Sequence, residues 1–165
     1  MTKKEDYITL HFVLGQGQNE TNCSDDLAEA FDQAQNSDIN SVWTQHDDCL
    51  AMVPGKRDVF VLDPFEGLAF QQLEKKFKCT VIGPRCLLSC LNKGEPVPQL
   101  PYPMYTAAMM DLVVTSTGFG KEAKKDIQSK VEKMGGIYSN AFTDSVTHVV
   151  ADVSLKMQGF HNISR

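Results

Sequence analysis

The residues best suited to chemistry follow a short apolar run, Asp111–Val114, in the second half of the chain. Thr117 and Gly118 stand in a turn rich in hydroxyls and glycines, just before a segment with helical apolar spacing. A hydroxyl and a backbone N–H at such a turn can hold a phosphate, and the positive end of the helix adds attraction. Lys124, one helical turn further on, can add a charge-assisted hydrogen bond. The alternative is a plain capping turn beside solvated lysines, and the residues alone favour that alternative.

The segment around this turn has the pattern of a strand, a helix and two further strands. Over residues 121–134, apolar side chains recur at three- and four-residue steps, which predicts a helix. A Gly-Gly pair ends it, because glycine accepts the left-handed conformation of a helix C-cap. Two extended runs follow, Ile137–Phe142 and Thr147–Val150. We expect His148 to be a buried, hydrogen-bonded core histidine, since no nucleophile is spaced to use it.

The first half of the chain alternates strand and helix patterns. That alternation indicates a mostly parallel sheet with helices packed against it. Runs of β-branched and aromatic residues predict four strands, at Tyr7–Leu14, Ile39–Thr44, Val59–Leu62 and Thr80–Ile82.

Four prolines in Gly94–Pro103 are typical of a stiff linker at a domain boundary. Strand and helix patterns on its two sides look like one repeated unit. Only 55 residues run from Asp111 to the end, against 88 in Tyr7–Gly94, so we expect the second unit to be incomplete. A truncated product or isoform, or a domain that needs residues absent here, would explain that length. The expected divisions are a first unit over residues 6–94, a Pro-rich linker over 95–109, the N-terminal part of a second unit over 110–156, and a tail over 157–165.

Composition narrows the classes of partner. The chain has 165 residues and a formal charge of −5. No Lys or Arg lies between Lys4 and Lys56, which argues against direct DNA binding by the first unit, because that needs clustered cations. No apolar run approaches the roughly 20 residues of a membrane span.

Five cysteines without a CxxC pair are typical of reduced thiols. A zinc site at Cys79, Cys86 and Cys90 is poorly spaced, and we expect no metal or cofactor.

The order of the second half is strand, hydroxyl-and-glycine turn, basic helix, Gly-Gly, strand and then Thr147–Val150. That order resembles the first half of a BRCT domain. The end of the first unit, a strand followed by Gly83-Pro84 and a helix with Cys90, resembles the end of a BRCT domain. Cys86 stands where that family usually has Trp, which marks a divergent unit.

Several short motifs narrow the resemblance, and they lie roughly between Val59 and Asp152. They resemble the N-terminus of the topoisomerase-II-binding replication and checkpoint scaffold, in the family named after Cut5 and Mus101. The motifs are Asp63–Gly67, Val81–Pro84, Pro101–Tyr105, Met110-Asp111, Met134–Gly136 and Val146–His148.

The resemblance implies an α/β fold of tandem BRCT-like units, each a parallel four-stranded sheet flanked by helices, with the second unit incomplete. It implies a nuclear, non-enzymatic scaffold that binds Ser/Thr-phosphorylated proteins in replication initiation and in DNA-damage checkpoint and repair signalling. A phosphate-independent docking or structural BRCT pair is the alternative.

The resemblance also assigns phosphate contacts, and it favours a phosphate site over a plain capping turn. It places the family's phosphate-binding Thr at Thr117, beside Gly118, and its basic helix residue at Lys124. Its third contact, a Lys at the start of the second helix, corresponds to Lys156. In the first unit the equivalent turn is Gly15-Gln16-Gly17, which has no hydroxyl and precedes an acidic helix. We therefore expect no phosphate binding by the first unit.

Overall fold

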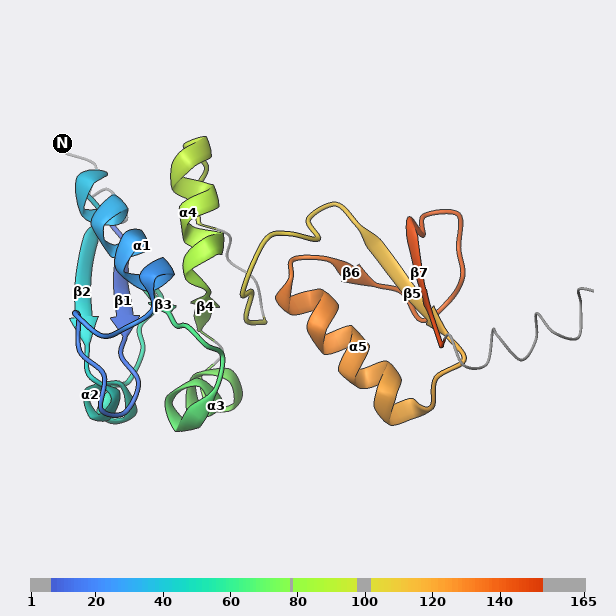
Figure 1. The fold of residues 1–165 in the computed structure, drawn as a ribbon, viewed down its shortest axis with the longest axis horizontal. Coiled ribbons are helices and arrows are strands. Elements are labelled where there is room, and N and C mark those ends of the chain that lie inside the picture. The colour runs from blue at the N-terminus through green and yellow to red at the C-terminus, as the bar shows by residue number, and fades with distance from the viewer. Residues whose placement is uncertain (1–6, 78, 98–101, 153–165) are drawn as a thin grey trace, which may run out of the picture. The chain divides into compact units, whose positions relative to one another are not determined.

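The computed structural model describes residues 7–77, 79–97 and 102–152 of the chain. The chain divides into two compact units, Met1–Ala107 and Ala108–Arg165, each with its own sheet (Figure 1). Lys156 and the expected tail at 157–165 lie outside the described residues.

A parallel four-stranded sheet forms the centre of the first unit. Its strand order is β2-β1-β3-β4, so the chain leaves β1 toward one edge and later returns to build the other. Phe12 in β1 lies opposite both Trp43 and Val61, which fixes the register across the middle of the sheet. The strands are β1 (Thr9–Val13), β2 (Asn40–Thr44), β3 (Asp58–Val61) and β4 (Thr80–Ile82).

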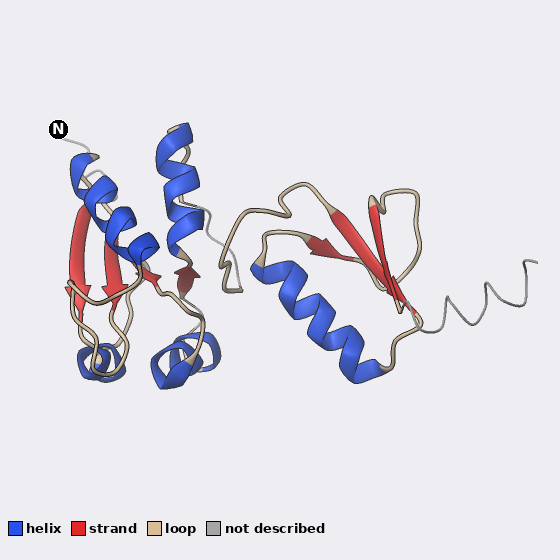
Figure 2. Ribbon diagram, viewed as in Figure 1, coloured by secondary structure: helices blue, strands red, loops and turns tan. Residues whose placement is uncertain are grey.

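Helices cover both faces of this sheet (Figure 2), because the strand side chains alternate between two apolar cores. Leu10 and Phe12 point to the face that α1 and α4 cover. Val13 and Phe60 point to the face that α2 and α3 cover. Burying each such side chain stabilises the fold by about 1.5–3 kcal/mol. The helices are α1 (Asp25–Asn36), α2 (His46–Ala51), α3 (Gly67–Lys75) and α4 (Pro84–Lys93).

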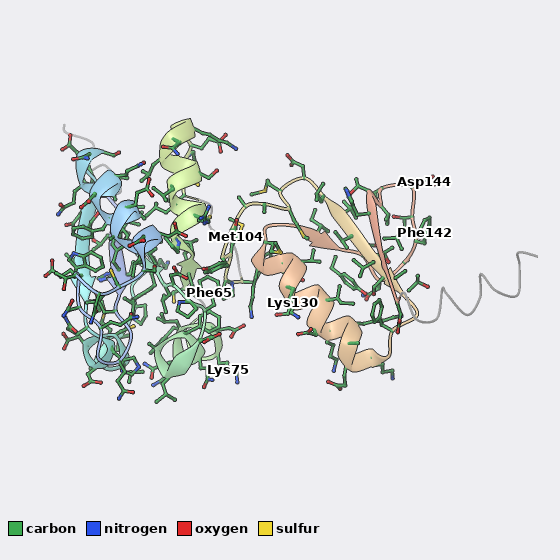
Figure 3. The ribbon with its side chains drawn as sticks, viewed as in Figure 1. Phe65, Lys75, Met104, Lys130, Phe142 and Asp144 are labelled. Atoms are coloured by element: carbon green, nitrogen blue, oxygen red, sulfur yellow. The ribbon has the colours of Figure 1, made fainter. Side chains whose placement is uncertain are left out.

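Part of the segment expected as a linker packs into the first unit. Met104 has 0% exposure and belongs to the core that α1 and α4 cover. Its backbone N–H donates to the carbonyl of Val81 at 3.0 Å, and its carbonyl accepts from Gly83 N–H at 2.9 Å. Residues Tyr102–Tyr105, which we call the strap, thus add a short extended piece beside β4 (Met104 is labelled in Figure 3).

The second unit has a three-stranded parallel sheet and one helix. Its order, β6-β5-β7, repeats the β2-β1-β3 part of the first unit. Counterparts of α2, α3, β4 and α4 are absent from its described residues. The expected α/β fold with an incomplete second unit is confirmed, with three strands in place of four. The elements are β5 (Val113–Thr117), α5 (Lys121–Lys133), β6 (Ile137–Tyr138) and β7 (His148–Ala151).

The core of the second unit is small. Val114 and Val131 are the buried hydrophobic side chains among its described residues. Ile137 is 60% exposed and Phe142 is 78% exposed, so apolar surface faces solvent at β6 and at the loop before β7. An apolar surface of this kind on a sheet is more typical of a face that another element covers.

His148 is exposed, so the expectation of a buried core histidine is wrong. It opens β7 at the margin of the three-stranded sheet, where nothing among the described residues covers it. Its Nδ1 lies 2.9 Å from the hydroxyl of Thr147, which is the contact that holds the ring.

Candidate phosphate site

The turn between β5 and α5 presents two donors to solvent. Thr117 ends β5 opposite Ala151, and its carbonyl accepts a hydrogen bond from Asp152 N–H at 3.3 Å. Its backbone is therefore held by the sheet, while its exposed hydroxyl has no hydrogen-bond partner among the described residues. Gly118 follows with φ +81°, the left-handed conformation that glycine adopts without strain. The chain turns there and leaves both groups accessible.

The N-terminus of α5 lacks a side-chain cap. Its N-cap residue is Gly120, which has no side chain to accept from the first-turn N–H groups. Such unpaired N–H groups and the helix dipole together favour an anion. Glu122 in the first turn opposes a bound anion, because its carboxylate has the same sign. The geometry at the end of β5 is therefore open to a phosphate, and a basic side chain has to outweigh Glu122.

Lys124 is placed to be that basic side chain. It lies in the first turn of α5, where its own N–H donates to the Gly120 carbonyl at 3.0 Å. Its side chain is half-buried and has no ion pair among the described residues. By contrast, Lys130 further along α5 pairs with Asp126 at 2.9 Å. The structure thus brings Thr117, Gly118 and Lys124 to the same strand-to-helix junction, whereas Lys156 lies outside the described residues.

The matching junction of the first unit is filled by the protein's own carboxylate. Ser24 caps α1, accepting from Leu27 N–H at 3.2 Å, and donates its hydroxyl proton to Asp63 at 2.6 Å. The other oxygen of Asp63 accepts from the hydroxyl of Tyr105. In place of the Thr117 hydroxyl the first unit has Leu14, which is fully buried. These contacts give a physical reason for the prediction that the first unit does not bind phosphate, which stays a prediction.

A shallow pocket opens beside this junction, at the carboxyl ends of β1 and β3. Its polar lining comes from Gln18, His46, Asp63 and Glu66. Gln18 accepts from Gly15 N–H at 3.0 Å and so holds the loop after β1. With two carboxylates and no Lys or Arg in its lining, the pocket repels anions.

Two hydrogen-bonded contacts do not follow from the sequence patterns. Asp63 belongs to a short motif, but the hydroxyls that it accepts from lie 39 and 42 positions away. Thr147 belongs to a strand pattern, but it also bonds to the neighbouring strand. Its hydroxyl accepts from Val113 N–H at 2.9 Å, and its N–H donates to the Val113 carbonyl at 2.8 Å. A Thr immediately before a β-branched strand was the available signal for this second contact.

The thiols are not poised for catalysis. Burial raises the pKa of Cys86 to about 12 and that of Cys49 to about 11. A thiol is nucleophilic as the thiolate, so these groups stay protonated and inert at neutral pH. Within the described ranges, no group of three or more His, Cys, Asp or Glu side chains is arranged to hold a metal ion. In that same part of the chain, every helix is too short or too polar to cross a bilayer.

A buried polar network in the first unit is structural. His11 Nε2 lies 2.9 Å from Asp58, and its Nδ1 lies 3.3 Å from the Thr44 hydroxyl. Burial raises the pKa of Asp58, but hydrogen bonds from Gly55 N–H and from His11 outweigh it, so the net shift is downward. The network joins β1, β2 and β3, and His11 stacks on Phe60 rather than facing a pocket.

The first unit has a parallel sheet of order β2-β1-β3-β4 with two helices on each face, and later in the chain the second unit repeats the order of its first three strands. These features define a protein of tandem BRCT-type units. Residues 9–107 match the family described as "TopBP1, BRCT0 domain", and residues 112–156 match the family described as "twin BRCT domain". The chain belongs to the first of these families and is a BRCT-repeat protein. BRCT domains are generally non-enzymatic protein-interaction modules.

Curated relatives and solved structures add two further similarities. The human "Protein ECT2" is 41% identical over 100 residues, and the mouse "Protein ECT2" is 35% identical over 100 residues. In both cases the match covers 60% of this chain but 11% of the relative, so the chain spans a small part of those proteins. Crystal structures of Rad4 BRCT1,2 with a Crb2 or a Mdb1 phosphopeptide cover 92% of this chain and 82% of theirs, at 13% identity and a TM-score of 0.36. At that TM-score the backbones superimpose only loosely, and the family matches make the assignment.

Proposed function

We propose that the chain is a non-enzymatic scaffold module that binds Ser/Thr-phosphorylated proteins through its second unit. The observation that supports this most is the set of unused donors at one junction. Thr117 ends β5, α5 begins without a side-chain cap, and Lys124 lies in the first turn of that helix. Among the described residues, neither the Thr117 hydroxyl nor the Lys124 side chain has a hydrogen-bond or ion-pair partner. Membership of a BRCT family supports a protein-interaction role.

In the proposed complex each donor has a distinct part. Thr117 donates its hydroxyl proton, and Gly118 donates its backbone N–H. Lys124 supplies the charge, because a phosphate monoester carries about −1.5 to −2 at neutral pH. The two neutral donors fix the geometry, and the cation outweighs Glu122. Lys156 remains a further proposed contact, on the family resemblance alone.

The cellular setting is also part of the proposal. We infer that the partners are phosphorylated proteins of DNA-damage checkpoint signalling and replication initiation, and that the chain acts in the nucleus as a member of the Cut5 and Mus101 family. The acidic N-terminal region does not favour direct DNA contact by the first unit.

A phosphate-independent docking role is the second candidate. The observation that favours it is the exposed apolar surface of Ile137 and Phe142 in the second unit. Such a surface can bind a partner through burial alone, without any phosphate.

A titration by fluorescence anisotropy separates these two functions. The probes are an acidic peptide with one phosphothreonine and its unphosphorylated twin. Lys124→Glu should weaken binding of the phosphorylated peptide by at least the loss of one charged hydrogen bond, which is about 1.5–3 kcal/mol, or roughly ten- to hundred-fold. Thr117→Ala should weaken it as well, by a smaller factor.

Lys125→Glu is the matched control, because it makes the same charge change at the next, exposed position of α5. It should weaken binding less than Lys124→Glu. Equal affinity for the two peptides, unchanged by Thr117→Ala and Lys124→Glu, would reject the phosphate site and leave the docking role.

A further inference from the structure

The strap, Tyr102–Tyr105, is bound closely to the first unit. Met104 is buried and bonded through its backbone to both Val81 and Gly83. The Tyr105 carbonyl oxygen lies so near Gly83 that a Cβ added there would fall 2.1 Å from it. The Tyr105 ring meets the Phe65 ring edge-on, with centroids 5.0 Å apart. The strap therefore depends on a small residue at position 83 and on an aromatic neighbour (Phe65 and Met104 are labelled in Figure 3).

One side-chain hydrogen bond joins the strap to the centre of the unit. The Tyr105 hydroxyl donates to Asp63, which lies two residues beyond the end of β3 and also accepts from Ser24. A hydrogen bond to a charged acceptor is worth about twice a neutral one. Because Asp63 is held from its other side by the cap of α1, the Tyr105 hydroxyl meets a fixed acceptor.

The next fixed point along the chain belongs to the second unit. Met109 N–H donates to the Met134 carbonyl at 2.8 Å, at the end of α5. Only Thr106, Ala107 and Ala108 lie between the strap and this anchor. The connection between the units is therefore much shorter than the expected linker over 95–109.

We propose that the Tyr105–Asp63 hydrogen bond is a latch that keeps the strap docked and so limits the free connection between the two units to Thr106–Ala108. If the strap leaves β4, Tyr102–Tyr105 join the connection, which then includes residues 102–108. Flexible chains of three and seven residues span on the order of 10 Å and 15 Å respectively.

The latch matters for any partner that contacts both units. When two modules bind one partner, the second contact forms at an effective concentration set by the connection between them. A docked strap keeps that connection short, and a released strap lengthens it. This inference does not depend on phosphate binding by the second unit.

Amide hydrogen exchange on the full chain tests the latch. The two reporters are the N–H groups of Gly83 and Met104, whose hydrogen bonds exist only while the strap is docked. Tyr105→Phe removes the hydroxyl and keeps the ring against Phe65. We expect exchange at both reporters to become about tenfold faster or more, as for the loss of one charge-assisted hydrogen bond.

Two controls make the result specific. Tyr102→Phe removes a hydroxyl from the same strap, and that hydroxyl has no hydrogen bond among the described residues, so both reporters should keep their rates. The Leu14 amide, bonded to the Thr44 carbonyl between β1 and β2, reports on the sheet and should exchange at the wild-type rate in Tyr105→Phe. Unchanged rates at Gly83 and Met104 would overturn the proposal. So would an equal acceleration at Leu14, because the bond would then support the whole unit rather than the strap.

Discussion

Asp63 occupies in the first unit the position that a ligand is proposed to occupy in the second. Its carboxylate lies beside the N-terminus of α1, where it accepts hydroxyl protons from Ser24 and Tyr105. The nearby cation, Arg85, is paired with Asp26 at 2.9 Å. A phosphate arriving there would meet carboxylates, and the described cation beside them is already paired. The start of the first helix is thus bonded to the protein's own carboxylate in the first unit. In the second unit, the start of α5 has no side-chain partner among the described residues.

The Tyr105 hydroxyl gives the first unit an alkaline sensitivity. The hydrogen bond to Asp63, helped by burial, raises the pKa of Tyr105 from 10.0 to about 12. The folded state then holds this proton more tightly than the unfolded state, so its stabilising contribution is complete below pH 10 and is lost as the pH rises toward 12. We predict that denaturant midpoints of the wild type fall between pH 10 and 12 more steeply than those of Tyr105→Phe. Parallel profiles would contradict this assignment.

Thr147 links β7 to the start of β5, and its replacement tests that role. Thr147→Val keeps the shape and removes a hydroxyl that both accepts from Val113 N–H and lies 3.1 Å from the Val113 carbonyl. Because the site is exposed, water replaces part of the loss, and we expect a decrease in the free energy of unfolding of about 0.5–1.5 kcal/mol. Urea denaturation measures it. Ser145→Ala, which removes a hydroxyl bonded to Thr143 within the preceding loop, is the control and should change stability less.

The end of α5 shows why one element needs two glycines. Gly135 adopts φ +83°, whereas Gly136 is needed for space, because a Cβ there would lie 2.9 Å from Val131 and 3.1 Å from Met109. Gly136→Ala should therefore crowd Val131 and Met109 in the small core of the second unit and lower the free energy of unfolding by about 1–3 kcal/mol. Gly135→Asn should cost less than Gly135→Ala, since Asn tolerates the left-handed region. Thermal denaturation of the full chain compares the three variants, and equal losses for Asn and Ala at 135 would contradict the explanation.

Local patterns predicted the elements well, because each depends on neighbours in sequence. The apolar spacing over residues 121–134 and the Gly-Gly pair predict a helix. The structure places that helix at Lys121–Lys133. The burial of Met104 could not be predicted, since it depends on pairing with Ile82 across the Pro-rich segment. The exposure of His148 was missed for the same reason, because burial depends on which elements cover a strand.

The candidate site could be predicted only in part. Thr117 and Gly118 follow a β-branched strand, and a turn at that position is a local property. The absence of a side-chain cap at Gly120 was also readable from the sequence, whereas the capture of Ser24 by Asp63 depends on contacts between distant segments. Long-range hydrogen bonds of this kind fill the junction between β1 and α1, whereas among the described residues no side chain caps α5 at the junction between β5 and α5.

At the scale of the whole molecule, the two units differ in how much core they bury. The first unit encloses two apolar cores, whereas the buried hydrophobic side chains among the described residues of the second unit are Val114 and Val131. A small core offsets little of the entropy lost on folding. We predict that residues 108–165 alone show no cooperative thermal transition in calorimetry, while residues 1–107 unfold cooperatively. A sharp melt of isolated 108–165 as a monomer would contradict this prediction.

We propose that phosphate is bound at the junction of β5 and α5 and not at the junction of β1 and α1. A titration of the isotope-labelled chain with the phosphothreonine peptide, followed in proton–nitrogen correlation spectra, tests it most directly. We predict that the amides of Thr117, Gly118 and Lys124 shift in a saturable way, while those of Leu14 and Gly15 do not. The unphosphorylated twin should leave all five unchanged. Shifts at Leu14 and Gly15, or the same shifts with both peptides, would contradict the account.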